Sequence, residues 1–143
     1  MARASYLEEN SGATFGLKKK VEYINADRTL SNEDSGKVFM CAATGGAVAI
    51  TLPTSLEDGV CYKFIVWEET PSNDITIAAG SAIVSMVHKD AGGDAAASTA
   101  GTQISNVILD TTAQRGDYVN LMSWNGEWVA EAMSSINAGI HTS

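Results

Sequence analysis

Two histidines, two cysteines and three pairs of adjacent acids are the side chains best able to do chemistry in residues 29–143 of this 143-residue chain. The histidines are His88 and His141, and the cysteines are Cys41 and Cys61. A zinc site needs about four such ligands at suitable spacing, and these four are scattered along the chain without it. We therefore expect neither a metal site nor a cofactor.

The sequence also lacks the signatures of an enzyme. Neither histidine adjoins a nucleophile motif, so both are expected to be solvated; His88 beside a carboxylate in a cleft would be the sign of an enzyme. Each acid pair falls in a predicted turn, where carboxylates act as caps and solvated ends rather than as an opposed catalytic pair. These pairs are Glu33-Asp34, Glu57-Asp58 and Glu68-Glu69. The sequence predicts a protein that is not an enzyme.

Both cysteines fall in predicted strands beside large apolar residues. A free cysteine behaves as a small buried hydrophobe, and a cytoplasmic origin disfavours a disulfide. We expect two buried free thiols, and the strand order, which the sequence leaves open, decides whether they lie close together.

The clearest structural signal is Asn125-Gly126, which lies between two runs rich in aromatic and aliphatic residues. Both residues tolerate positive φ, as a type I′ turn requires. The sequence therefore predicts a β-hairpin. In this register Trp124 faces Glu127 across the hairpin and Trp128 faces Ser123, so the two tryptophans point to opposite sides. One tryptophan is expected in the core and the other at an exposed tip.

Short strands separated by turn signals fill the rest of the chain. A second hairpin is predicted over 37–42 and 47–52, joined by a Gly-Gly turn. Residues 60–67 form the strongest strand, with apolar residues on both sides, and residues 88–101 form a long exposed loop. Seven to nine strands at this spacing predict an all-β fold, an antiparallel β-sandwich or barrel that is jelly-roll-like.

Residues 1–28 are predicted to form an extended N-terminal arm. Its apolar residues follow no sustained period, apart from a short strand at 20–24, and such segments are often ordered by a partner. Residues 29–133 form a single all-β domain, and residues 134–143 form a polar C-terminal tail. The candidate partner-binding residues of the arm are Tyr6, Leu7, Phe15, Leu17, Lys18, Lys19 and Lys20.

The net charge is −8, and residues 29–143 account for it while the arm is nearly neutral. An acidic body repels phosphates, so we expect no nucleic-acid partner. No apolar run approaches the roughly 20 residues that span a bilayer, and the N-terminus lacks the apolar stretch of a secretory signal. We expect a protein made in the cytoplasm, with no membrane partner.

The order of strand and turn segments resembles that of small virion proteins of tailed bacteriophages, particularly capsid decoration (cement) proteins, and of β-modules in phage tail fibres. The resemblance covers residues 29–133 and implies an all-β protein, commonly a trimer, that terminal arms fix to an assembled shell. The segments that carry it are the turn Leu30–Gly36, Ile50-Thr51-Leu52-Pro53, Asp58-Gly59 with Tyr62-Lys63-Phe64, and Trp124-Asn125-Gly126-Glu127-Trp128.

By this resemblance the chain is expected to be a non-enzymatic virion structural protein on the capsid surface, made in the host bacterial cytoplasm. It would clamp neighbouring capsid subunits, with the major capsid protein and other copies of itself, in a homotrimer, as partners. The arm's apolar residues would act as anchors, and Lys18–Lys20 would meet acidic capsid patches. The alternative is a receptor- or glycan-binding β-module of a tail fibre, in which Trp124 or Tyr118 stacks on sugars.

Overall fold

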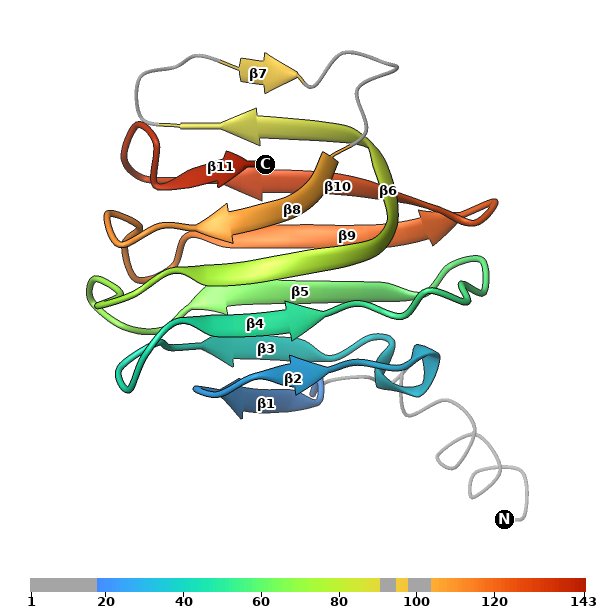
Figure 1. The fold of residues 1–143 in the computed structure, drawn as a ribbon, viewed down its shortest axis with the longest axis horizontal. Helices are drawn as coiled ribbons and strands as arrows, with labels where there is room; N and C mark the ends of the chain where they lie inside the picture. The colour runs from blue at the N-terminus through green and yellow to red at the C-terminus, as the bar shows by residue number, and fades with distance from the viewer. Residues whose placement is uncertain (1–17, 91–94, 98–103) are drawn as a thin grey trace.

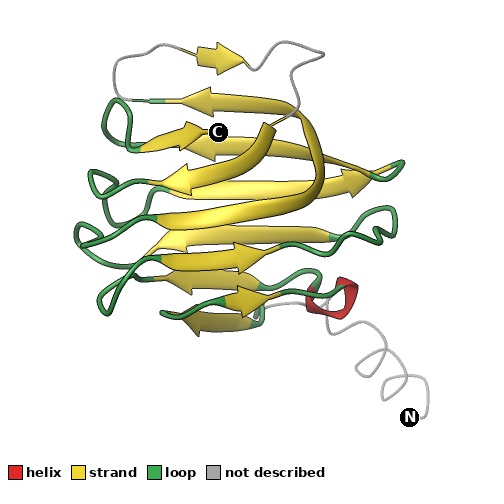
Figure 2. Ribbon diagram, in the orientation of Figure 1, coloured by secondary structure: helices red, strands yellow, loops and turns green. Residues whose placement is uncertain are grey.

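A computed structural model describes residues 18–90, 95–97 and 104–143 and shows an essentially all-β protein (Figure 1, Figure 2). Within these ranges the only helical turn is the 3-10 helix η1 (Asn32–Asp34), and no helix has the length and apolarity needed to cross a bilayer. The strands are β1 (Val21–Ile24), β2 (Arg28–Thr29), β3 (Val38–Cys41), β4 (Val48–Thr51), β5 (Cys61–Val66), β6 (Ile75–Lys89), β7 (Ala95–Ala97), β8 (Ile104–Leu109), β9 (Tyr118–Trp124), β10 (Glu127–Met133) and β11 (Ile140–Thr142).

The strands form two layers that face each other across the core (Figure 1). Layer A contains β1, β3, β5, β9, β10 and the second half of β6, with β7 at its edge; layer B contains β2, β4, the first half of β6, β8 and β11. The 15-residue strand β6 bends from layer B into layer A and so belongs to both. The all-β sandwich predicted from the sequence is confirmed.

The first part of the chain winds between the two layers. In layer A, β1 pairs with β3 and β3 with β5; in layer B, β2 pairs with β4 and β4 with β6, and all four pairings are parallel. Later strands pair mostly antiparallel, as in β5 with β9, β9 with β10 and β6 with β8. The sheets are therefore mixed, not antiparallel throughout or jelly-roll-like as the sequence predicted.

The predicted hairpin over 37–42 and 47–52 is wrong. These segments form β3 and β4, which lie in different layers and pair with other strands. Phe39 in β3 and Ile50 in β4 are both fully buried, and they point into one core from opposite layers. Alternation identifies the buried side of a strand, but it does not say whether the next strand lies beside it or across the core. The glycine turn here crosses between layers.

The Asn-Gly hairpin is confirmed as β9 and β10. Asn125 and Gly126 have φ values of 52° and 77°, as the predicted turn requires. Trp128 faces Ser123 across the hairpin and is 0% exposed, whereas Trp124 is 65% exposed. Both expectations for the tryptophans are therefore correct.

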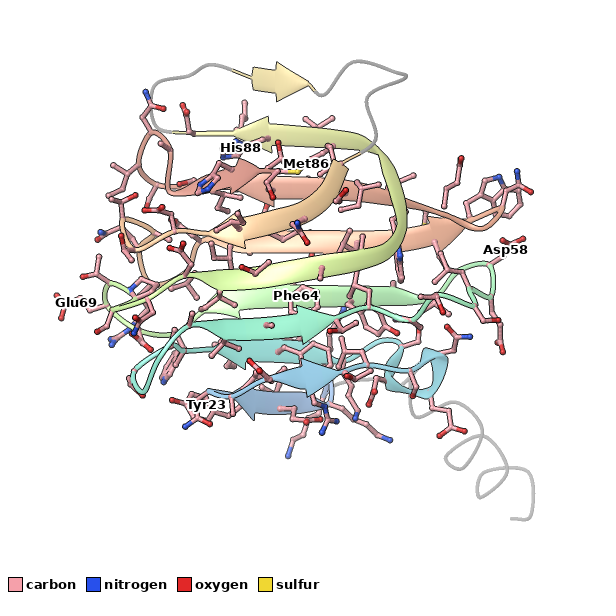
Figure 3. All side chains as sticks on the ribbon, viewed as in Figure 1. Tyr23, Asp58, Phe64, Glu69, Met86 and His88 are labelled. Carbon is pink, nitrogen blue, oxygen red and sulfur yellow. The ribbon has the colours of Figure 1, made fainter. Side chains whose placement is uncertain are left out.

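An aromatic cluster fills the core between the layers. The rings of Phe39 and Phe64 stack with centroids 5.3 Å apart, and the rings of Tyr62 and Trp128 are tilted at 5.6 Å. Such offset and tilted pairs add to the free energy gained by burial. Phe64 lies near the middle of the body in Figure 3, with Tyr23 towards the β1 end and His88 towards the other.

Both ends of the body differ from the predicted boundaries. The short strand expected at 20–24 is β1, and Ile24 is buried in the core, so the body begins before residue 29. At the other end, residues 140–142 pair with β8 as β11, and Ile140 is 1% exposed. The C-terminal segment is therefore part of the sandwich, because its apolar residue completes the core of layer B, and it is not a free tail.

The region predicted as a long exposed loop is partly strand. His88 and Lys89 end β6, and residues 95–97 form β7, which pairs with them. Residues 91–94 and 98–103 lie outside the described residues, as do residues 1–17.

Candidate protein-binding face

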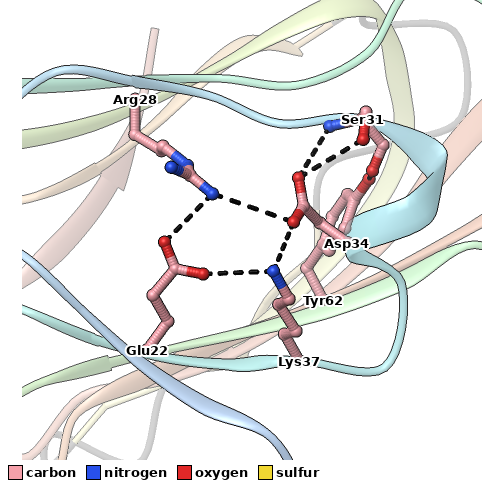
Figure 4. Close-up of polar contacts among 6 residues, drawn as sticks. All are labelled: Glu22, Arg28, Ser31, Asp34, Lys37 and Tyr62. Carbon is pink, nitrogen blue, oxygen red and sulfur yellow. Dashed lines mark hydrogen bonds and ion pairs between the residues drawn. The ribbon is translucent and has the colours of Figure 1, made fainter.

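A cluster of charged side chains fixes the point where the chain enters the sandwich (Figure 4). Lys37 donates to Glu22 at 3.1 Å and to Asp34 at 2.5 Å, and Arg28 contacts the same two carboxylates at 3.0 and 3.8 Å. The Ser31 N–H donates to Asp34 at 3.0 Å. Because these residues come from β1, β2, η1 and the start of β3, the cluster ties both layers together at the β1–β2 end.

The charges in this cluster stabilise one another. Burial alone would raise the pKa of Asp34, but hydrogen bonds from Lys37 and the Ser31 N–H, with the charges of Lys37 and Arg28, hold that pKa below its usual value. The hydrogen bonds to Asp34 and Glu22 in turn raise the pKa of Lys37. Asp34 and Lys37 therefore stay ionised near neutral pH, and residues 18–20 leave the body from a fixed position beside them.

The outer face of layer A carries rows of apolar side chains. Side chains alternate across a strand, so partners in register form rows that cross the layer. The row that contains Lys89, the last residue of β6, has one charged residue. Its members are Tyr23, Met40, Ile65, Tyr118, Met133 and Lys89. The neighbouring rows are Val21, Val38, Lys63, Asn120, Glu131 and Val87, and then Cys61, Met122 and Val129.

Much of this apolar surface is open to solvent. Val87, Met122, Val129 and Met133 are 51%, 51%, 41% and 44% exposed. They line an open groove of about 750 Å³ over β5, β9, β10 and the second half of β6. A contiguous apolar surface of this kind is typical of a protein-interaction site.

The groove is basic, although the protein is acidic. Four lysines line it, and Glu131 is the one acid among the described lining residues. The Lys63 ammonium group lies over the ring of Tyr118, 4.3 Å from its centroid. This contact holds the positive charge on the outer face of layer A. The other lining lysines are Lys19, Lys37 and Lys89. The groove therefore combines apolar contact area with an excess of positive charge.

The predicted partner-binding residues lie in part at this groove. Lys18, Lys19 and Lys20 are exposed just before β1, and Lys19 lines the groove. The other predicted anchors lie outside the described residues: Tyr6, Leu7, Phe15 and Leu17. Within the described ranges the structure thus brings one predicted residue, Lys19, to the candidate site.

Sequence reasoning missed the apolar face itself. Met122, Val129 and Met133 belong to the predicted hairpin, but their position beside Val87 and Ile65 depends on strand pairings that the sequence does not reveal. One signal was available, because the strand over 60–67 is apolar on both sides. In the structure its outer residues are half-buried rather than fully buried.

The residues that could do chemistry are separated from one another. His88, expected in a solvated loop, is 8% exposed in the interior, so that expectation is wrong. His141 is exposed, as expected, and its Nδ1 lies 4.0 Å from Asp110. No group of three or more histidine, cysteine or acidic side chains that could hold a metal ion occurs within 18–90, 95–97 and 104–143.

Both cysteines are free. Cys41 is 0% exposed, and burial raises its pKa to about 12; Cys61 is only half-buried and lines the groove. They sit on neighbouring strands but towards opposite ends, since Cys41 is in register with Val66.

The acid pairs behave largely as caps. Asp58 accepts a hydrogen bond from the Asn125 N–H at 2.7 Å, and Glu68 accepts one from the Ala43 N–H. Asp34 is the exception, since it joins the charged cluster. A comparison with protein-family models finds no match to this chain, and a comparison with curated protein sequences finds none either.

Proposed function

We propose that this protein is a non-enzymatic structural protein of a bacteriophage virion, which binds the outside of the capsid and clamps neighbouring capsid subunits. The observation that supports it best is the open apolar face of layer A, carried on a rigid two-layer body. The resemblance of residues 29–133 to capsid decoration proteins supports the phage context. In this proposal the major capsid protein is the partner.

The clamp works by binding only the assembled shell. A ligand that binds one state stabilises that state by mass action, so a protein that contacts two neighbouring subunits at once opposes their separation. The face of layer A supplies apolar contact area, and the N-terminal segment supplies anchors at Tyr6, Leu7, Phe15 and Leu17 with cations at Lys18–Lys20. A homotrimer would join three such contacts and raise the apparent affinity through effective concentration.

Co-sedimentation with purified capsid shells tests the proposal. The intact protein should sediment with expanded shells and raise their melting temperature, and a Val129→Glu/Met133→Glu variant should bind at least about tenfold more weakly because charged side chains oppose burial. An Ala49→Glu/Thr76→Glu variant, with the same charge change on layer B, is the matched control. Absence of the protein from purified virus particles would contradict the proposal.

The contribution of the N-terminal arm is tested by a deletion shorter than the predicted arm of residues 1–28. Because Ile24 is part of the core, removing residues 1–28 would damage the body, whereas removing residues 2–17 leaves every described strand intact. Unchanged shell binding after this deletion would mean that the arm does not contribute to binding. The outer face of layer A would then be the proposed contact by itself.

One observation favours a second function. Trp124 is 65% exposed at the tip of the β9–β10 hairpin, where an aromatic ring can stack on a sugar, as in a receptor-binding module of a tail fibre. A glycan array with the intact protein tests this alternative, with Trp124→Ala as the variant that should lose binding. An array without hits argues against it. His88, whose placement beside a carboxylate in a cleft would have indicated an enzyme, is 8% exposed in the interior.

A further inference from the structure

We propose that residues 1–17 of this chain occupy the groove on layer A when the protein is not bound to its partner. The inference concerns the unbound protein and holds whatever the partner is. In this arrangement the N-terminal segment shields the apolar face until a partner displaces it.

The groove requires an apolar occupant. In the part of the chain that the structure describes, four apolar side chains of the groove are each about half exposed: Met122, Val129, Met133 and Val87. Covering such apolar area lowers the free energy. The N-terminal segment carries the matching side chains, Tyr6, Leu7, Phe15 and Leu17. It offers large apolar residues separated by small and polar ones, as a chain lying across a groove needs.

The charges of segment and groove are complementary. Lys63 and Lys89 line the groove, and only Glu131 opposes them among its described lining residues. Lys37 is already engaged by Glu22 and Asp34. The segment contains one adjacent acid pair, Glu8-Glu9, and a single cation, Arg3.

The point of attachment places the segment at the groove. The described chain begins at Lys18, and Lys19 already lines the groove. The layer from β1 to β6 spans five strand spacings, about 24 Å, and nine extended residues from Lys18 back to Glu9 reach about 30 Å. Glu8 and Glu9 can therefore reach Lys89 on the far strand. Tethering holds the segment at millimolar effective concentration.

A second copy of the body is a poorer occupant. Symmetric docking through this face would place the same patch, with its excess of lysines, on both sides of the interface. It would also bring together two bodies that each carry excess negative charge. The N-terminal segment has the opposite charge where the groove needs it.

Cys61 provides a native reporter for this contact in the full-length chain. Its thiol lines the groove, whereas Cys41 is buried with a pKa of about 12 and serves as an internal control that stays unlabelled until the protein unfolds. We expect slow alkylation of Cys61 in the intact protein. A Glu8→Lys/Glu9→Lys variant should be labelled about fivefold faster, because two exposed ion pairs are replaced by repulsion, and added salt should reduce the difference.

Rescue separates docking from a general effect of charge. Lys63→Glu/Lys89→Glu in the Glu8→Lys/Glu9→Lys background should restore slow labelling, since the ion pairs re-form with exchanged signs. Glu57→Lys/Glu69→Lys, which makes the same change in net charge at exposed turn residues that do not line the groove, should leave the rate unchanged. A rate that rises on dilution would assign the segment to a neighbouring copy, and a constant rate would assign it to the same copy; both support docking.

Two results would overturn the inference. Fast labelling of Cys61 in both the intact protein and the Glu8→Lys/Glu9→Lys variant means that the groove is open. Slow labelling in both, with a rate that rises on dilution, means that a second body covers it. Neither result depends on shell binding, so failure here is distinct from failure of the proposed capsid role.

Discussion

The two outer faces of the sandwich enclose one core, yet they carry different side chains. The outer face of layer A bears valine, methionine, tyrosine and tryptophan, and seven of its large apolar residues are exposed: Val21, Tyr23, Val87, Met122, Trp124, Val129 and Met133. The outer face of layer B has rows of small or polar residues: Thr29, Thr51, Ala78 and Asn106, then Ala49, Thr76, Ile108 and His141. Only Ile108 among these is a large aliphatic residue, and it is half-buried.

This difference indicates what each face meets. Layer B has a polar outer side and an apolar inner side, the pattern of a sheet that faces water. Layer A carries large apolar side chains on its outer side as well as on its inner side, as expected of a sheet that is covered on both. Because both layers share the core, folding alone does not require the outer apolar residues of layer A. The difference between the two faces therefore supports the proposed binding role of these residues, which can be tested by asking which residues hold the fold together.

The largest expected effect comes from the inner side of β10. Trp128→Ala should lower the free energy of unfolding by about 3–5 kcal/mol, because it leaves a large cavity among Tyr62 and its neighbours. Trp124→Ala, four residues away on the exposed side, should change it by about 0.5 kcal/mol or less. Urea denaturation measures both. Equal losses would mean that the outer side of this hairpin also belongs to the core.

The next effect concerns the charged cluster that joins the layers at the β1–β2 end. Asp34→Asn should cost about 1–2 kcal/mol, since it removes a hydrogen-bonded charge from between Lys37 and Arg28. Glu33→Gln, at the exposed neighbouring acid, is the matched control. The pKa of Asp34 is lowered in the folded protein from 3.8, so its contribution is fully present above about pH 4. The contribution is lost as the pH falls through the folded pKa, and the two proteins should then converge in stability.

A smaller effect is expected at His88, on the inner side of the part of β6 that belongs to layer A. Burial lowers the pKa of His88 from 6.5, and the charges of Asp90 and Asp117 only partly oppose this. Protonation therefore favours the unfolded chain, so stability is fully present above pH 6.5 and declines as the pH falls towards the folded pKa. The loss between pH 7 and 5 should be on the order of 1 kcal/mol. Thermal melts across this range should show a shallower slope for His88→Gln than for the unaltered protein.

The sequence predicts local structure well where one turn determines the pairing. The Asn125-Gly126 hairpin follows from backbone preferences, and its register places Trp124 and Trp128 correctly. The pairing of β3 and β4 does not follow, because the same alternation fits a hairpin and a crossing between layers. His88 was misplaced for a related reason. The small residues after it indicate a loop, but its burial depends on β6 continuing into layer A beside β10.

Only one residue at the edge of the candidate site could be predicted from the sequence. Lys19 is singled out by the basic run before β1, whereas the apolar face exists only once β5, β9, β10 and β6 lie side by side. β6 is parallel to β10 and some 40 residues before it in the chain, so no local pattern brings Val87 beside Glu131. Long-range pairing of this kind is what periodicity in a single strand cannot show.

The smallest expected effect on stability tests whether the outer residues of layer A are needed for folding. Val129→Thr/Met133→Thr keeps β-favouring residues on β10 while removing apolar surface from the groove, so the free energy of unfolding should change by about 0.5 kcal/mol or less. The same variant should bind its partner more weakly and label faster at Cys61. Thr51→Val/Thr76→Val makes the reverse exchange on layer B and should alter neither property. A loss of stability comparable with that of Trp128→Ala would mean that the outer rows of layer A are part of the core, and their exposure would then no longer indicate a binding function.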